Sequence, residues 1–145
     1  MEKLKDIKGI ESSLGNLGNV YFYQGNFDKA EKNYQKAMKI VLEANDPLGQ
    51  GIYSEYLGNI FLKKEDAEKA IEQYEKAKEF MSAAKQDERK IKQLDDRIES
   101  IKKSPLFLKK NEEALVANFE SLISTGQKTK AIAKLQELEE IYFLS

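Results

Sequence analysis

Residues 17–37 read LGNVYFYQGNFDKAEKNYQKA, and residues 57–77 read LGNIFLKKEDAEKAIEQYEKA. The second stretch repeats the first one 40 residues later. Both begin Leu-Gly-Asn, both contain Lys-Ala at the same offset, and both end on an alanine that comes three residues after a tyrosine. A fixed period of this size indicates a repeat protein, in which each copy is one structural unit stacked on the next. A repeat array presents surface rather than a reaction centre, so the pattern favours binding over catalysis.

Each copy is predicted to be a pair of antiparallel helices. Apolar side chains recur three or four residues apart from Leu14 to Tyr21, which places them on one face of a helix. Gly25 is expected to end this helix, because glycine readily takes the left-handed conformation after a last turn, and Asn26 can cap the next helix. The first four helices are expected at residues 6–24, 27–44 and 47–64, and from residue 67 onward.

Asp46 and Asp66 are expected to begin the third and fourth helices. Pro47 fits the first helical position after Asp46, because that position needs no backbone N–H. Asp66 stands one 40-residue period after the first cap and is expected to act in the same way. Ser104-Pro105 repeats the signal and predicts a later restart.

The strict repeat fades after Met81. Residues 86–103 form a very polar predicted helix with one narrow apolar stripe, too short for a coiled coil. The stripe consists of Ile91, Leu94, Ile98 and Ile101. Residues 112–142 are predicted to be a degenerate third hairpin, with Gly126, Ala131 and Leu135 in place of the glycine, alanine and tyrosine of the first copy. The expected organisation is a single domain over residues 1–145 with six or seven helices and no strand, the two clear copies spanning 11–45 and 51–84.

The repeat resembles the tetratricopeptide family. That motif has Leu-Gly, an aromatic residue three positions after the glycine, an alanine nine later, another aromatic four later and an alanine three later. The first copy supplies Leu17, Gly18, Tyr21, Ala30, Tyr34 and Ala37, and the second supplies Leu57, Gly58, Phe61, Ala70, Tyr74 and Ala77. The resemblance is to variants with longer helices, since the usual period is about 34 residues. It implies an all-α, right-handed solenoid of helical hairpins.

Gly18 and Gly58 have a structural role in this interpretation. A glycine inside a helix costs roughly 1 kcal/mol relative to alanine. Such a cost is expected where a neighbouring helix comes too close to admit a Cβ. The conserved spacing of small and aromatic residues within the two copies is therefore interpreted as packing rather than as a ligand site.

The first helix of each pair is expected to line a concave face, where a partner would bind. Asparagine amides there can donate to and accept from a peptide backbone, and aromatic rings add contact area. The candidate residues are Asn16, Asn19, Phe22, Tyr23, Glu55, Tyr56, Asn59 and Lys63. In the alternative interpretation, the asparagines bond neighbouring helices and the aromatic rings complete the core.

Composition argues against several other functions. The chain has no Cys and no His, so it lacks a thiolate nucleophile, the commonest general base and the commonest transition-metal ligand. The net charge of −1 argues against a dedicated nucleic-acid binder. No apolar run is long enough to insert into a membrane, and the charged N-terminus lacks the apolar region of a secretory signal. We therefore expect a cytoplasmic protein without catalytic residues, metal or cofactor.

The expected partner is another protein or an extended peptide, bound by an adaptor or scaffold. One alternative is self-assembly through terminal helices, including the apolar end at residues 141–144, with the groove occupied by the chain itself. Another is a regulatory or sensory module of a larger signalling protein. The sequence alone leaves these alternatives open.

Overall fold

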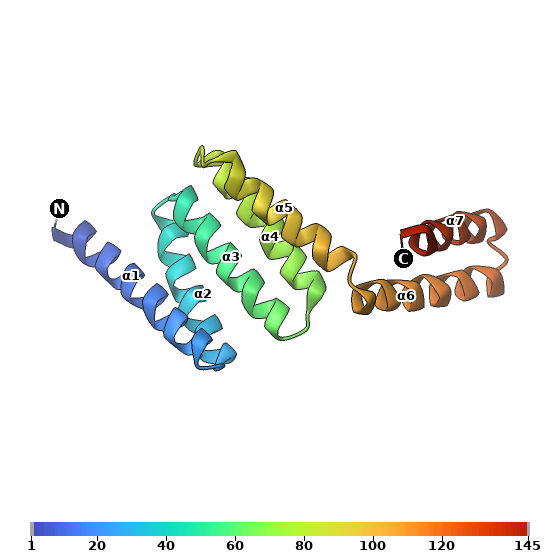
Figure 1. The fold of residues 1–145 in the computed structure, drawn as a ribbon, viewed down its shortest axis with the longest axis horizontal. Helices are drawn as coiled ribbons and strands as arrows, with labels where there is room; N and C mark the ends of the chain where they lie inside the picture. Colours follow the sequence, from blue (N-terminus) through green and yellow to red (C-terminus); the bar gives the residue numbers. More distant parts are fainter. Residues whose placement is uncertain (1, 145) are drawn as a thin grey trace. The chain divides into compact units, whose positions relative to one another are not determined.

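The computed structural model describes residues 2–144, and the side chains of residues 5–140 (Figure 1). These residues form helices connected by short turns, and no strand occurs among them, which confirms the all-α class. The helices are α1 (Glu2–Tyr23), α2 (Phe27–Glu43), α3 (Pro47–Lys63), α4 (Ala67–Ala83), α5 (Glu88–Lys102), α6 (Pro105–Ser124) and α7 (Lys128–Leu144). The side chains of the apolar end, residues 141–144, lie outside the described part.

The helix starts follow the caps that the sequence predicts. The Asn26 side chain accepts from the backbone N–H of Lys29 at 3.3 Å, which satisfies one of the N–H groups left free in a first turn. Asp46 and Asp66 bond the N–H three residues ahead in the same way, at 3.1 and 3.2 Å. Ser104 caps α6, with a proline at the first helical position. Only α1 differs noticeably, because it begins at Glu2 rather than near Asp6.

Five of the helices are followed by a residue in the left-handed backbone conformation, and the residue type differs among them. Gly25 and Gly126 have φ of 76° and 74°, as their place after a last turn predicts. Asn45, Glu65 and Lys85 take the same left-handed conformation, with φ of 51°, 59° and 54°. For a residue with a Cβ this conformation costs about 1 kcal/mol, and the sequence does not signal it at Glu65 or Lys85.

The chain divides into two compact units, residues 1–98 and 99–145, which we describe separately. In the first unit α1 packs on α2, α2 on α3 and α3 on α4. Its core contains alanine, aliphatic and tyrosine side chains from α2, α3 and α4, including Ala30, Tyr34, Ala37, Val41, Tyr53, Leu57, Ile60, Ala70, Tyr74 and Ala77. In the second unit α6 and α7 form a hairpin. The single domain and the repeat limits stay predictions.

Glycines and tyrosines hold each hairpin of the first unit together. The Tyr34 ring occupies the space that a Cβ on Gly18 would need. In the second hairpin, a Cβ added to Gly58 would lie 2.7 Å from Tyr74 Cε1. Both tyrosines are buried, with exposed fractions of 2% and 0%. The close approach expected from the sequence is confirmed, and an aromatic ring rather than a helix backbone makes it.

This contact predicts opposite effects for two glycine substitutions. Gly58→Ala should lower the free energy of unfolding by about 1–3 kcal/mol, because the new methyl group displaces the Tyr74 ring. Gly9→Ala, also inside a helix but with no atom within 4 Å of the added Cβ, should raise it by up to about 1 kcal/mol. Urea unfolding followed by circular dichroism measures both. Equal stabilisation by the two substitutions would contradict the contact.

Candidate functional site

Asn19 and Asn59 each accept a hydrogen bond from a buried tyrosine of the following helix. The Tyr34 hydroxyl donates to Asn19 Oδ1 at 2.7 Å, and the Tyr74 hydroxyl donates to Asn59 Oδ1 at 2.6 Å. Burial raises the pKa of Tyr34 to about 12 and also raises the pKa of Tyr74, so both hydroxyls keep their protons at neutral pH. Each Gly-Asn pair therefore receives one tyrosine: the glycine makes room for the ring and the asparagine binds its hydroxyl.

The two asparagines differ in what they retain for a ligand. The carbonyl oxygen of Asn19 is used by Tyr34, which leaves the two N–H groups of its amide as donors. The carbonyl oxygen of Asn59 accepts a second bond from Arg97, at 3.0 Å. Asn59 is thus engaged from α4 and from α5 together.

Helix α5 supplies a pair of cations to the second copy. Glu55 has only 8% of its surface exposed, and its carboxylate lies 2.8 Å from Lys90 Nζ and 3.5 Å from an Arg97 nitrogen. The Arg97 guanidinium also lies over the Tyr74 ring, 5.5 Å from its centroid. Lys90 and Arg97 are seven residues apart, which puts them on one face of α5. This face occupies the part of the predicted concave surface formed by Glu55 and Asn59.

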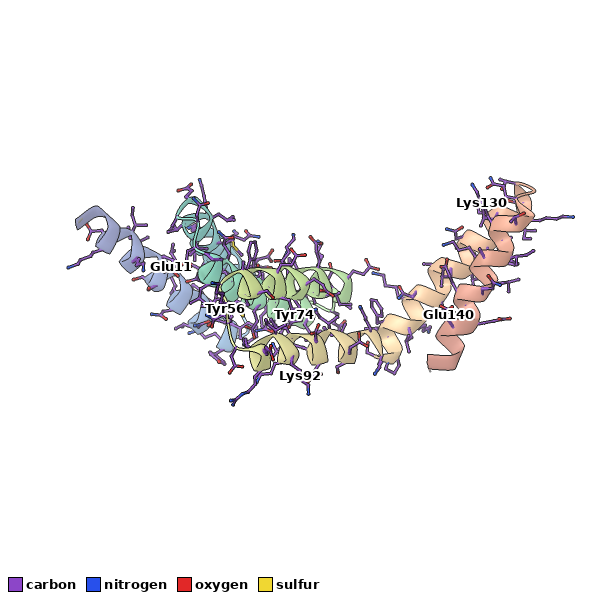
Figure 2. The ribbon with its side chains drawn as sticks, turned by 90° about the horizontal axis from the view of Figure 1, so that it is seen from above. Glu11, Tyr56, Tyr74, Lys92, Lys130 and Glu140 are labelled. Carbon is purple, nitrogen blue, oxygen red and sulfur yellow. The ribbon has the colours of Figure 1, made fainter. Side chains whose placement is uncertain are left out.

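Tyr56, labelled in Figure 2, belongs to an aromatic cluster formed by side chains of α2 and α3. Its ring centroid is 5.1 Å from that of Tyr34 and 6.0 Å from that of Tyr53. The Tyr53 hydroxyl donates to the side chain of Glu11 on α1, and burial, reinforced by that carboxylate, raises the pKa of Tyr53. Tyr56 is therefore half-buried against core residues, as the alternative interpretation of the aromatic side chains described.

The open part of the predicted surface is the C-terminal end of α1. Tyr23 is 87% exposed, and its ring meets the Phe22 ring edge-on with centroids 5.8 Å apart. Phe22 is half-buried and in turn contacts Phe27, at 5.5 Å. Asn16 is exposed on α1, and Lys63 is exposed at the end of α3. These side chains leave apolar and polar groups in reach of a partner.

The sequence analysis did not identify Lys90 and Arg97 as contacts of the predicted surface. The 40-residue period gives a signal: Ile98 stands one period after Gly58, and Leu94 one period after Ser54. Leu94 and Ile98 are buried, at 1% and 2% exposure. With isoleucine in place of glycine, α5 has no notch for a tyrosine ring, so the pattern of the first two copies does not continue from it.

The first unit stacks two antiparallel hairpins, each with a glycine notch in its first helix, and this arrangement defines a helical-repeat protein. The sequence profile of the tetratricopeptide repeat matches residues 9–83, which cover most of α1 and all of α2 and α3 and reach the last residue of α4. The chain therefore belongs to the tetratricopeptide-repeat family. No curated protein matches the chain. Domains of this family generally mediate protein–protein interactions and are generally not enzymes.

None of the helices that the structure describes is both long and apolar enough to cross a membrane. Among the same residues, no cluster of three or more acidic side chains has the arrangement of a metal site.

Because Glu55 is buried and its two partners are not, removing the charges of Lys90 and Arg97 should destabilise the protein more than removing the charge of Glu55. Replacing Lys90 and Arg97 together by methionine should lower the free energy of unfolding by about 2–3 kcal/mol, because the Glu55 charge stays buried without its partners. Glu55→Gln should cost less than about 1 kcal/mol, since the two cations are 38% and 43% exposed and remain hydrated. Urea unfolding measures both variants.

The triple variant is the control for the other contacts of Arg97. Adding Glu55→Gln to the double variant should recover about 1–2 kcal/mol, because it removes the uncompensated charge. If Glu55→Gln destabilises both backgrounds equally, the carboxylate does not need these cations.

Proposed function

We propose that this protein is a non-catalytic interaction module that binds a protein or an extended peptide at the C-terminal half of α1. The observation that carries the proposal is the 87% exposure of Tyr23 above the half-buried Phe22. A large aromatic ring held on a packed support loses little conformational freedom on binding, which makes tyrosine a frequent energetic anchor of interfaces.

Asn16, Asn19 and Tyr23 are spaced by three and four residues, so they lie along one stripe of α1. The stripe is about 10 Å long, from seven residues at about 1.5 Å each, and matches about three residues of an extended peptide. The free N–H groups of Asn19 are donors for a peptide carbonyl, because Tyr34 occupies only its oxygen. Polar bonds along the stripe would set the register, and Tyr23 would supply apolar contact.

The proposed site keeps Phe22 as support, and Lys63 in the last turn of α3 supplies an exposed cation for an acidic group of the partner. Glu55 and Asn59 enter it only indirectly, because α5 engages both side chains. The first copy thus offers the contact surface, and the second copy with α5 stabilises the scaffold next to it.

Two substitutions test the site without disturbing the core. Asn19→Asp keeps an oxygen for the Tyr34 hydroxyl but removes the amide donors, and Tyr23→Ala removes an exposed ring. Peptides selected from a displayed random library on the wild-type protein serve as probes, with affinities read by fluorescence anisotropy. Each substitution should weaken the selected peptides by about tenfold or more.

Asn33→Asp is the matched control, since it adds the same charge on α2, outside the stripe, and should leave affinity unchanged. A library that yields no binding peptide, or peptides that bind the two site variants as tightly as wild type, would overturn the proposal.

A further inference from the structure

The outer face of α1 repeats a surface that is buried in α3. Residues one 40-residue period apart occupy equivalent positions on the two helices. Leu57 is 7% exposed, but its equivalent Leu17 is 43% exposed. Ile60 is 0% exposed against 50% for Val20, and Gln50 is 8% exposed against 54% for Ile10. Hence α1 exposes three large apolar side chains at positions whose equivalents in α3 are buried.

Helix α2 covers these positions in α3. The Gln50 side chain donates to the backbone carbonyl of Val41 at 3.2 Å. A Cβ added to Gly49 would lie 2.5 Å from Val41 Cγ1, so the two helices pack too closely for an alanine. Tyr53 packs against Tyr34, with ring centroids 6.3 Å apart. The face of α3 is therefore shaped for the second helix of the preceding copy.

Gly9 gives the outer face of α1 the same glycine position that α3 has, but no part of the chain that the structure describes is packed against it. It is the equivalent of Gly49, yet no atom lies within 4 Å of a Cβ added to it. A helical glycine costs roughly 1 kcal/mol, and close helix packing accounts for that cost at Gly49 but not at Gly9. Gly9 lines an open groove of about 700 Å³, together with Ile10, Ser13, Leu14 and Leu17 and the charged Lys5 and Asp6.

Helix α7 has the features of a second helix of a copy. Gly126 precedes it with φ of 74°, as Gly25 precedes α2 with φ of 76°. Ala131 stands at the place of Ala30, and both are buried, at 1% and 0% exposure. Within the second unit α7 packs on α6, as α2 packs on α1.

The face of α7 that would receive a following helix is exposed. Leu135 stands at the place of Tyr34 and is 42% exposed, against 2% for the tyrosine. Ile132, three residues earlier on the same face, is 58% exposed. In α2, the equivalent Tyr34 lies against Tyr53 and Tyr56 of α3. Helix α7 thus exposes a surface like the one by which α2 contacts α3. Helix α1 exposes a surface like the one by which α3 contacts α2.

We propose that copies of this chain associate head to tail, with α7 of one copy packed on the outer face of α1 of another as α2 packs on α3. The contact continues the internal stacking of the repeat across two molecules. One pair of helices buries less than the roughly 1,600 Å² of a standard interface, so the association is weak and depends on concentration. Because the two surfaces differ, the contact is heterologous, and a pair joined by one such contact still has one free surface of each kind for further copies.

Complementary blocking variants test this geometry. Leu17→Glu places a charge on the α1 surface, and Leu135→Glu places one on the α7 surface. Sedimentation equilibrium of the full chain over a concentration series should show wild-type mass rising beyond that of a dimer. Each variant alone should stay monomeric. An equimolar mixture should form dimers and nothing larger, because only one intact surface of each kind remains.

Two further variants separate association from folding. Leu42→Glu changes a side chain of similar exposure, 50%, on α2 away from both surfaces, and should associate as wild type does. Gly9→Ala should strengthen the helix yet weaken association by about tenfold, because the methyl group occupies the space at Gly9 that a packed helix would enter, as Val41 does at Gly49. Wild-type protein that stays monomeric, a single blocking variant that self-associates like wild type, or a mixture that stays monomeric would each overturn the proposal.

Discussion

The first unit depends on the packing of one tyrosine ring against one glycine in each hairpin. Tyr34 and Tyr74 fill the spaces left by Gly18 and Gly58, and their hydroxyls bond the asparagines that follow those glycines. Burying an aromatic side chain contributes roughly 1.5–3 kcal/mol, which outweighs the roughly 1 kcal/mol that a helical glycine costs. The contact fixes how closely the two helices of a hairpin pack, and therefore which surfaces they present to the next hairpin.

The helices and their limits follow closely from the sequence because their signals are local. Asn26 and Asp46 cap helices through bonds to residues three positions ahead, and Gly25 ends α1 through its own backbone conformation. The left-handed Glu65 gives no such signal, since its conformation is imposed by the turn between two packed helices. The glycine notches were also predictable. Glycine is unfavourable inside a helix, and its recurrence at equivalent positions 18 and 58 indicates that a neighbouring group packs too closely for a Cβ.

The candidate site was only partly predictable because the partner of a side chain depends on tertiary structure. Nothing local to Asn19 or Asn59 reveals that a tyrosine 15 residues later takes the amide oxygen. Likewise, Glu55 reads as a surface carboxylate until Lys90 and Arg97 are placed beside it by α5. The two copies also differ in what covers them: the first copy keeps an open aromatic residue in Tyr23, while α5 engages Glu55 and Asn59 of the second copy.

The repeat thus explains both packing and the surfaces that remain available. Positions that are buried in both copies, such as Ala30 and Ala70, are structural, whereas positions buried in one copy and exposed in the other differ in whether a neighbouring helix covers them. Leu17 and Leu57 illustrate the difference, because identical residues at equivalent positions differ sixfold in exposure, at 43% and 7%.

A double-mutant cycle between Gly18 and Tyr34 tests the central claim most directly. Tyr34→Val removes the ring atoms that occupy the notch, so Gly18→Ala should be tolerated or stabilising in that background. In the wild-type background the same alanine should destabilise, which gives a coupling free energy of about 1–3 kcal/mol. If the two substitutions are additive in the free energy of unfolding, the ring and the glycine do not constrain each other and the account fails.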